Sequence, residues 1–282
     1  MALILTDKRG DIEKAALKIR EGDVVIFPTE TVYGMGANAM DEEAIDKIFA
    51  YKNRPQNNPL ILHINNKEMA EALINITSME KDIVDILATT FWPGPITFLV
   101  KKSKYVNNKC TAGSKYVGLR CPQNKLARDL ISLSGVPIAA PSANISSKVS
   151  STTFDHVFGY FKDNKDITII KTEEPCSLGI ESTIIKIDNN TVSIVRPGII
   201  VEQDIKDALL NLDIEVKVDI PLTQSVNPGS QINHYQIDKK VVLANFMSDE
   251  SLDDDLSKFN IMKAINYYLM TNIFIDFGGH NL

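Results

Sequence analysis

Two periods of apolar residues alternate along most of the chain. Spacings of three and four residues predict amphipathic helices at 12–20, 41–51, 67–74, 79–91, 124–133 and 202–210. We expect Asp11 to cap the first of these helices and Gly22 to end it. Short apolar runs bounded by turn residues predict strands at 24–27, 60–64, 96–101, 117–120, 136–140, 167–171, 183–187 and 191–195, the last two joined by a hairpin. Helices and strands alternate early and the hairpin comes late, so we predict an α/β fold with a mixed sheet.

The loop after the apolar run 24–27 places polar side chains at the end of a buried strand. Pro28 ends the strand, and two threonines, a glutamate and a tyrosine follow before Gly34 and Gly36. Hydroxyl groups in this position suit a small polar ligand, but threonines in an ordinary connection also cap backbone amides. The loop alone leaves both interpretations open.

Two other loops also carry polar or charged side chains beside apolar strands. Lys52 and Arg54 precede a proline-punctuated loop that runs into the strand predicted at 60–64. The strand predicted at 136–140 ends in Pro141-Ser142-Ala143-Asn144. We therefore expect the ends of several strands to converge on one polar cavity.

Three arginines, Arg54, Arg120 and Arg196, are candidates for binding anions. A guanidinium group can hold a carboxylate or a phosphate through two bonds at once, although a single arginine is more often a surface salt-bridge partner. His63 is a further candidate, but a histidine in an apolar strand is more often a hydrogen-bonded core residue than a base. Taken one by one, these residues do not decide between structure and function.

The composition describes a folded protein without a membrane segment. A chain of 282 residues with 44% hydrophobic content can bury one sizeable core and a second small unit. No apolar run approaches the roughly 20 residues that a membrane span requires, so we expect a cytoplasmic protein with no membrane partner. The three cysteines are widely spaced and odd in number, which indicates neither a disulfide framework nor a zinc site.

The charge distribution is uneven. The net charge of −6 argues against a protein that binds nucleic acid by electrostatics alone. From Lys101 to Arg128, however, there are eight basic residues and no acidic one. Such a run is usually a solvated face, and near a nucleotide site it can also steer a triphosphate.

The sequence has none of the motifs of covalent, P-loop or metal-centred catalysis. There is no Ser-His-Asp order, no Gly-x-x-x-x-Gly-Lys-Ser/Thr and no His or Cys cluster at metal spacing. We therefore assign no catalytic side chain and no metal ligand. Any reaction at the predicted cavity is expected to depend on orientation and neutralised charge.

Taken together, the motifs resemble the YrdC family, the L-threonylcarbamoyladenylate synthases. The similar segments are 28–36, 52–63, Trp92-Pro93-Gly94-Pro95, 141–144, Ser182-Thr183 and Arg196-Pro197-Gly198. The resemblance implies a twisted mixed sheet with helices around a concave basic cavity. It also implies a nucleotidyltransferase that makes threonylcarbamoyl-AMP from L-threonine, bicarbonate and ATP with Mg²⁺. The product would pass to threonylcarbamoyl-transfer proteins that act on tRNA.

The resemblance also implies roles for individual residues. Those on the ATP side are Lys52, Arg54, Asn58, Ser142, Asn144, Ser150, Arg196 and Tyr235. Those on the threonine side are Thr31, His63, Arg120 and Ser182. Mg²⁺ would be held mostly by phosphate and water, since it keeps several waters in nucleotide sites.

The domain organisation follows the longer branch of the family. We expect a catalytic domain at 1–212, a linker at 213–238 that folds over the active site, and a reduced α/β segment at 239–282. Three positions depart from the family pattern: Tyr116, Asn124 and Asn233. Tyr116 could alter the nucleotide contact, and Asn233 could weaken the hold of the linker on ATP.

Two alternatives remain open. The same basic concave surface could belong to a non-catalytic RNA-binding module, which the run from Lys101 to Arg128 favours and the overall acidity disfavours. A carbamoyl-transferring enzyme, like the YrdC-like portion of hydrogenase-maturation proteins, is the other. The absence of a zinc-finger or acylphosphatase-like region in the sequence argues against it.

Overall fold

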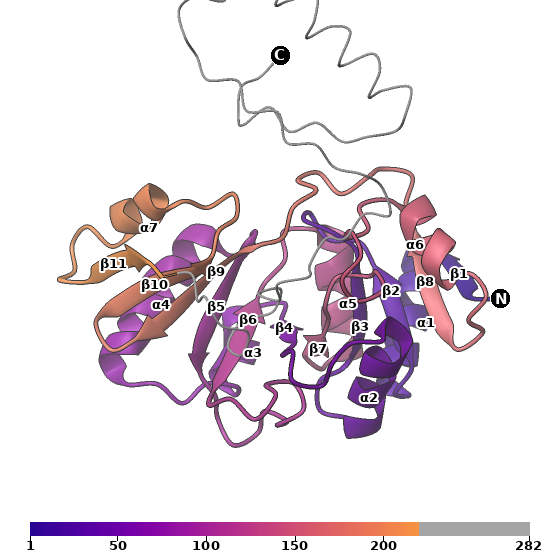
Figure 1. Cartoon of the computed structure of the whole chain (residues 1–282), viewed down its shortest axis with the longest axis horizontal. Helices are drawn as coiled ribbons and strands as arrows, with labels where there is room; N and C mark the ends of the chain where they lie inside the picture. The colour runs from indigo at the N-terminus through magenta and orange to yellow at the C-terminus, as the bar shows by residue number, and fades with distance from the viewer. Residues whose placement is uncertain (220–282) are drawn as a thin grey trace, which may run out of the picture. The chain divides into compact units, whose positions relative to one another are not determined.

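The structure, a computed structural model, describes residues 1–219, whose strands form one eleven-stranded mixed sheet (Figure 1). The strand order is β1-β8-β2-β3-β7-β4-β6-β5-β9-β10-β11. The strands are β1 (Leu3–Thr6), β2 (Val24–Phe27), β3 (Gly34–Asn38), β4 (Ile61–His63), β5 (Ile96–Lys101), β6 (Tyr116–Arg120), β7 (Ile138–Ala139), β8 (Ile167–Lys171), β9 (Thr183–Asp188), β10 (Thr191–Arg196) and β11 (Glu215–Val218). The helices are α1 (Arg9–Arg20), α2 (Glu42–Lys52), α3 (Lys67–Glu71), α4 (Ser78–Phe91), α5 (Lys125–Ser134), α6 (Phe154–Phe161) and α7 (Glu202–Ala208). The predicted mixed α/β fold is confirmed.

Alternation along the strands divides the core into two layers. In β2, Val24 and Ile26 belong to the core cluster that contains the buried stripes of α2 and α4. Val25 and Phe27 belong to the cluster built from α1 and α5. Successive side chains of a strand point to opposite faces. Helices α1 and α5 therefore cover one face of the sheet, and α2 and α4 cover the other.

The helices α1 and α5 cover only part of the sheet face on which they pack. Their core cluster includes residues of β1, β2, β7 and β8 but none of β4, β5, β6 or β9. A separate small cluster lies on that second group of strands and on the neighbouring β10, formed by Ile61, Leu99, Tyr116, Ile184 and Val195. Between the two clusters, the face of β4 is available to line a cavity.

Four elements escaped the sequence prediction: β1, β3, α6 and β11. Strand β3 lies where we expected a glycine-rich loop. A Cβ at Gly36 would come within 2.6 Å of both Ile138 Cγ2 and Phe27 Cε1, so the glycine serves close strand packing there. The predicted N-cap was also wrong: Lys8 precedes α1, and Asp11 instead accepts hydrogen bonds from Thr6 N at 3.0 Å and Thr6 Oγ1 at 2.7 Å.

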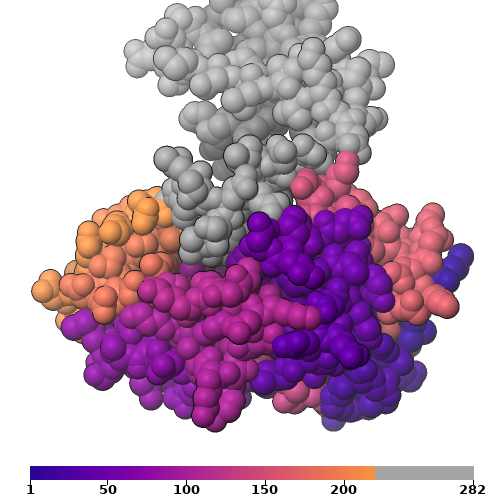
Figure 2. Space-filling model, turned by 60° about the horizontal axis from the view of Figure 1, so that its bottom comes forward, coloured from indigo at the N-terminus to yellow at the C-terminus, as the bar shows by residue number. Residues whose placement is uncertain are grey.

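The last described strand extends the sheet into the segment expected to be a linker. Strand β11 pairs in parallel with β10, with Thr191 opposite Glu215. The chain around residues 200–219, drawn in orange, forms one edge of the molecule in Figure 2. Residues 213–218 thus belong to the sheet region, whereas the rest of the expected linker, with Asn233 and Tyr235, and the segment 239–282 lie outside the described residues. No helix within residues 1–219 is long and apolar enough to cross a membrane.

Candidate active site

A small cavity runs along the uncovered face of β4. Leu60, Leu62 and Ile64 point into the core, and the alternate positions Pro59, Ile61 and His63 line the cavity. Its volume is about 50 Å³, which is room for one or two water molecules. A bound amino acid must therefore extend beyond the enclosed space or displace lining side chains.

Strand register brings the charged groups of the cavity together. Strands β4 and β6 are parallel, with His63 directly opposite Arg120. Strand β5 is antiparallel to β6 and parallel to β9, so Ser182, just before β9, comes to the same edge of the sheet as Arg120. The end of β10 returns to this edge and supplies Arg196. Three regions far apart in the sequence, 54–63, Arg120 and 182–196, thus contribute Arg54, His63, Arg120, Ser182 and Arg196 to one lining.

Arg120 is held by a buried ion pair. Its side chain is 5% exposed, and its Nη2 donates to Oε1 of Glu30, which is 4% exposed, at 2.7 Å. Its Nε is buried without a hydrogen-bond partner in the part of the chain that the structure describes. Buried polar atoms nearly always have a partner, so an orphaned donor in a cavity wall indicates a place for a ligand.

His63 is buried beside Arg120 as a neutral ring. Burial, and secondly the charge of Arg120, lower the pKa of His63 from 6.5 to about 3. Its Nδ1 is also buried without a partner among residues 1–219, and the edge of Phe27 packs against its ring at 6.2 Å between centroids. Near neutral pH, His63 can give a ligand a hydrogen bond but not a positive charge.

Arg54 and Arg196 are both held by carbonyl groups. Arg54 donates from Nε to Asn58 O at 3.1 Å and from Nη2 to Pro59 O at 2.8 Å. Arg196 donates from Nε and Nη2 to Ser182 O at 3.0 and 2.8 Å, and a β-bulge between Ile194 and Arg196 shifts its position. Burial, and secondly the charge of Arg196, lower the pKa of Arg54 to about 9. Two like charges facing one cavity favour a polyanion between them.

Lys52 supports the loop after β7. It is 1% exposed, and its Nζ donates to the carbonyl oxygens of Ser142 and Asn144. Burial, and secondly the charge of Arg54, lower its pKa well below 10.5. The Asn144 side chain donates to Ile145 O and Lys148 O, while its Oδ1 is buried without a partner among the described residues. The loop therefore presents another unfilled acceptor.

The model of the family described as "Telomere recombination" (Sua5, YciO, YrdC) matches residues 18–198. A Threonylcarbamoyl-AMP synthase of Pyrococcus abyssi is 38% identical over 252 residues, covering 88% of this chain and 73% of the relative. This chain belongs to the Sua5/YciO/YrdC family. The family predicted from sequence is therefore confirmed, together with the enzyme class that its relatives' names carry.

Other similar proteins differ in how much of their own length this chain covers. The Threonylcarbamoyl-AMP synthase of Bacillus subtilis is 37% identical over 225 residues, and this chain spans 64% of it. Among solved structures, P. abyssi Sua5 in complex with L-threonine is 33% identical with a TM-score of 0.79, covering 98% of this chain and 83% of that one. E. coli YciO, at 19% identity and a TM-score of 0.63, shares the fold.

Six of the predicted site residues line the small cavity of this Sua5/YciO/YrdC member: Arg54, His63, Arg120, Ser142, Ser182 and Arg196. The five others within residues 1–219 lie behind the lining. Lys52 and Asn144 meet at the loop after β7, Asn58 accepts from Arg54, Thr31 shares a hydrogen bond with Thr29 at 2.9 Å, and Ser150 donates to Glu181. Tyr235 lies outside the described residues. Whether any of these residues binds a substrate stays a prediction.

Sequence reasoning placed Thr29 and Glu30 in a candidate loop without giving either residue a role of its own, and it gave Glu181 no role. Thr29 and Glu181 line the small cavity, and Glu30 holds Arg120. Thr29 Oγ1 also accepts from Val32 N at 3.2 Å and donates to Val32 O at 2.7 Å. The two interpretations of this loop are therefore compatible, since the same hydroxyl closes the turn and faces the cavity. The sequence feature that could have indicated a role for Glu30 is its position: a charged residue between the buried strand 24–27 and the glycines Gly34 and Gly36.

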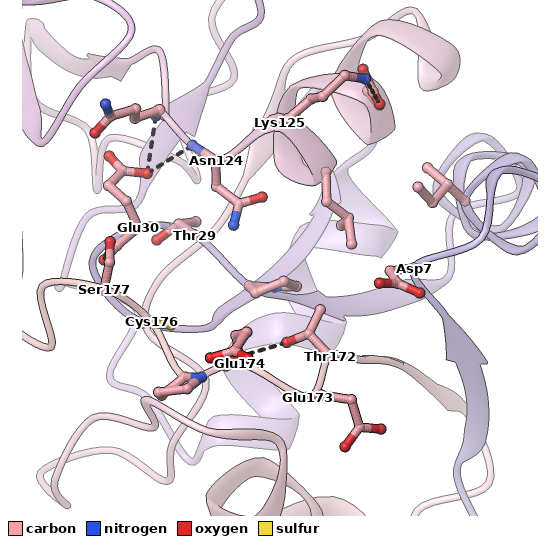
Figure 3. A pocket seen from close by; sticks show the side chains of 16 residues that line it. Asp7, Thr29, Glu30, Asn124, Lys125, Thr172, Glu173, Glu174, Cys176 and Ser177 are labelled. Atoms are coloured by element: carbon pink, nitrogen blue, oxygen red, sulfur yellow. Dashed lines mark hydrogen bonds and ion pairs between the residues drawn. The ribbon is translucent and has the colours of Figure 1, made fainter.

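A larger cavity lies on the other side of Glu30 (Figure 3). Its volume is about 690 Å³, and its wall carries the carboxylates of Asp7, Glu30, Asp129, Glu173 and Glu174. Thr29 lines both cavities, whereas Arg120 lines only the small one and Glu30 only the large one. The Glu30–Arg120 pair thus stands between them.

Tyr116, one of the positions that depart from the family pattern, does not line the small cavity. Tyr116 donates its hydroxyl to Asp188 Oδ2 at 2.7 Å, and Lys186 lies 4.6 Å from its ring centroid. The expected effect on the nucleotide contact is therefore not supported by its position. Asn124 caps α5 through Ala127 N and lines the large cavity.

Most of the basic run from Lys101 to Arg128 is paired with neighbouring groups. Five of its eight members are held in this way: Lys101 by Glu80 and Asp188, Lys102 by Asn108 and Thr111, Lys109 by Glu42 and Asp46, Arg120 by Glu30, and Lys125 by Asp129. This pairing weakens the RNA-binding alternative. Within residues 1–219, no group of three His, Cys, Asp or Glu residues could hold a metal ion, and the three cysteines are free.

Proposed function

We propose that this protein makes L-threonylcarbamoyl-AMP from L-threonine, bicarbonate or CO₂, and ATP, and releases pyrophosphate. This is the first step of threonylcarbamoyladenosine formation in tRNA, and transfer proteins acting on tRNA would consume the product. The observation that carries the proposal is one cavity in which three arginines meet a neutral histidine and Ser182. These groups suit an amino-acid carboxylate and a triphosphate bound against this wall, with most of both substrates outside the small cavity itself.

Arg120 suits the threonine carboxylate, because its Nη2 is held by Glu30 and its Nε is an unfilled donor among the described residues. His63 and Ser182 lie in the same lining and suit the remaining polar groups of threonine. Arg54 and Arg196 suit the phosphates. With both substrates held, the threonine amine loses a proton and forms a bond to the carbon of CO₂, or of bicarbonate with loss of water. A carbamate oxygen then bonds to the α-phosphorus as pyrophosphate leaves.

Mg²⁺ would arrive with ATP and neutralise its phosphates. The small cavity contains one carboxylate, Glu181, which already accepts from Ser150. The lining therefore fits a metal held chiefly by phosphate and water, as expected for Mg²⁺, and not a metal held by the protein alone. The residues of this chain contribute orientation and positive charge.

The test is pyrophosphate release from ATP with bicarbonate and Mg²⁺, with L-threonine present, omitted, or replaced by L-serine or L-valine. We expect release that requires threonine and that collapses in Arg54→Ala. Arg9→Ala is the matched control, since Arg9 is 86% exposed and pairs only with Glu13 among the contacts described. Its activity should equal that of the wild type.

Absence of release with every amino acid, from a folded protein, would overturn the proposal. In that case RNA binding is measured over a salt series. Strongly salt-dependent RNA binding without ATP turnover would establish the binding module instead.

A further inference from the structure

We infer that Glu30 is the positioning residue for threonine: it fixes Arg120 through Nη2 so that the guanidinium, whose Nε has no partner among residues 1–219, meets the substrate carboxylate. This inference rests on the proposed function. Glu30 is 5% exposed and follows β2 in the chain, 90 residues before Arg120. Its Oε1 lies 2.7 Å from Arg120 Nη2.

The second oxygen of Glu30 anchors the pair to a helix. Oε2 accepts from Gln123 N at 3.0 Å and from Asn124 N at 3.3 Å, as the dashed lines in Figure 3 show. Asn124 is the N-cap of α5, which packs on the sheet through Ala127, Leu130 and Ile131. One carboxylate therefore ties Arg120 to both the β2 loop and the start of a packed helix. A flexible arginine is thereby restricted before substrate binds, which lowers the entropy cost of binding.

Glu30 is poorly suited to act as a base. Burial by itself raises the pKa of Glu30, but the charge and hydrogen bond of Arg120 and the backbone hydrogen bonds outweigh it, so the net shift is downward from 4.5. Both of its oxygens are occupied, and it lines the large cavity and not the small one. Its effect on threonine must pass through Arg120.

The pairing also sets the charge of the small cavity. Arg54 and Arg196 face the same space as Arg120. Of the three arginines, Glu30 is bonded only to Arg120, and its other side-chain contacts are the amides of Gln123 and Asn124 just before α5. Removing the negative charge while keeping the shape of the side chain should therefore disturb the threonine subsite and spare the ATP subsite.

The experiment compares wild type and Glu30→Gln in pyrophosphate release, titrating L-threonine and ATP separately. The glutamine side chain has one acceptor oxygen and one donor nitrogen, whereas both oxygens of Glu30 accept. The variant therefore loses the hydrogen bond with Arg120 or those with the amides of Gln123 and Asn124. We expect KM for threonine to rise by about 10-fold or more and KM for ATP to stay within about twofold. A role in folding alone would lower the active fraction and leave both KM values unchanged, and that result would overturn the inference.

Substrate analogues sharpen the test. L-Threoninamide lacks the carboxylate, so the preference of the protein for L-threonine over L-threoninamide in calorimetric binding should shrink in Glu30→Gln. In the Arg120→Ala background, Glu30→Gln should have no further effect on threonine affinity, because its partner is gone. Equal weakening of both ligands, or additive effects, would contradict a role through Arg120.

Glu80→Gln is the matched control. Glu80 is a buried carboxylate that also binds helix amides and a cation, but it lies outside both cavities. Its KM values should be those of the wild type. If Glu30→Gln fails to fold, Glu30→Asp is measured in the same way, since it keeps the charge and shortens the reach to Arg120. Wild-type release that does not depend on threonine would overturn the proposed function itself, whatever the variants do.

Discussion

Glu30 and Glu80 are two buried carboxylates with similar local bonding. Glu80 stands in the first turn of α4, where it accepts from Thr77 N at 2.8 Å and forms a capping box. It also accepts from Lys101 Nζ at 2.9 Å and Asn189 N at 3.0 Å. Each carboxylate thus joins one cation to backbone amides, of which at least one lies at the start of a helix.

The difference lies in what surrounds the cation. Lys101 also contacts Asp188 Oδ1 at 3.1 Å, and Asp188 accepts from Tyr116, so the Glu80 cluster is closed on itself. Around Glu30, both Arg120 Nε and His63 Nδ1 are buried without partners among residues 1–219. The Glu80 cluster contributes no such atom in the same range. A closed ionic cluster joins elements together, whereas an open one leaves groups for a ligand to satisfy.

The strongest test of this contrast removes each cation. Arg120→Ala should lower kcat/KM for threonine by roughly 100-fold or more, and should destabilise the fold by about 3–5 kcal/mol because Glu30 remains buried and unpaired. Lys101→Ala should destabilise less, since Lys101 is 30% exposed, and should leave kcat/KM unchanged. Pyrophosphate release and urea unfolding measure the two effects. Equal loss of activity in both variants would contradict the distinction between the open Glu30 cluster and the closed Glu80 cluster.

Removal of the second carboxylate tests whether the closed cluster is structural. Glu80→Gln should lower the free energy of unfolding by about 2–3 kcal/mol, because it weakens the capping box and the ion pair with Lys101. Activity per folded molecule should not change. The check is urea unfolding alongside active-site titration, and a raised KM for either substrate would argue against the assignment.

The pH dependence of the free energy of unfolding tests the Glu30 cluster through His63. His63 has a pKa of about 3 in the folded protein and about 6.5 in the unfolded chain. Between these values the unfolded state binds more protons, so the free energy of unfolding falls as pH falls from 6.5 toward 3. From about pH 7 to about pH 5 the loss should be about 2 kcal/mol. His63→Asn should flatten this slope in urea titrations, and an unchanged slope would contradict the burial of a neutral ring.

The smallest effect is expected from Tyr116→Phe. The change removes one hydrogen bond to Asp188 and should cost about 1 kcal/mol in unfolding free energy. KM for ATP should stay the same, because Tyr116 lies outside the lining of the small cavity. Steady-state kinetics over an ATP series provides the check. An altered KM would restore the view that this departure affects the nucleotide.

Local patterns in the sequence predicted most elements and many of the polar side chains. Val24–Phe27 is a strand over the residues expected, because a four-residue apolar run between a turn and Pro28 has few other conformations. Strand β3 escaped because its glycines signal a loop locally. The requirement for glycine at Gly36 comes from the close approach of Phe27 and Ile138, which exists only in the folded sheet.

Local spacing was thus enough to predict the helices and strands, the mixed α/β class and the arginines that suit anions. The folded chain was needed to see that His63 lies opposite Arg120, that Lys52 is buried under the loop after β7, and that Glu30 reaches the residues just before α5. The two kinds of information differ in the sequence separation over which they act. Periodicity and capping act between residues a few positions apart, whereas the contacts of Glu30 with Arg120 and Gln123 span 90 and 93 residues and exist only once the strands are in register.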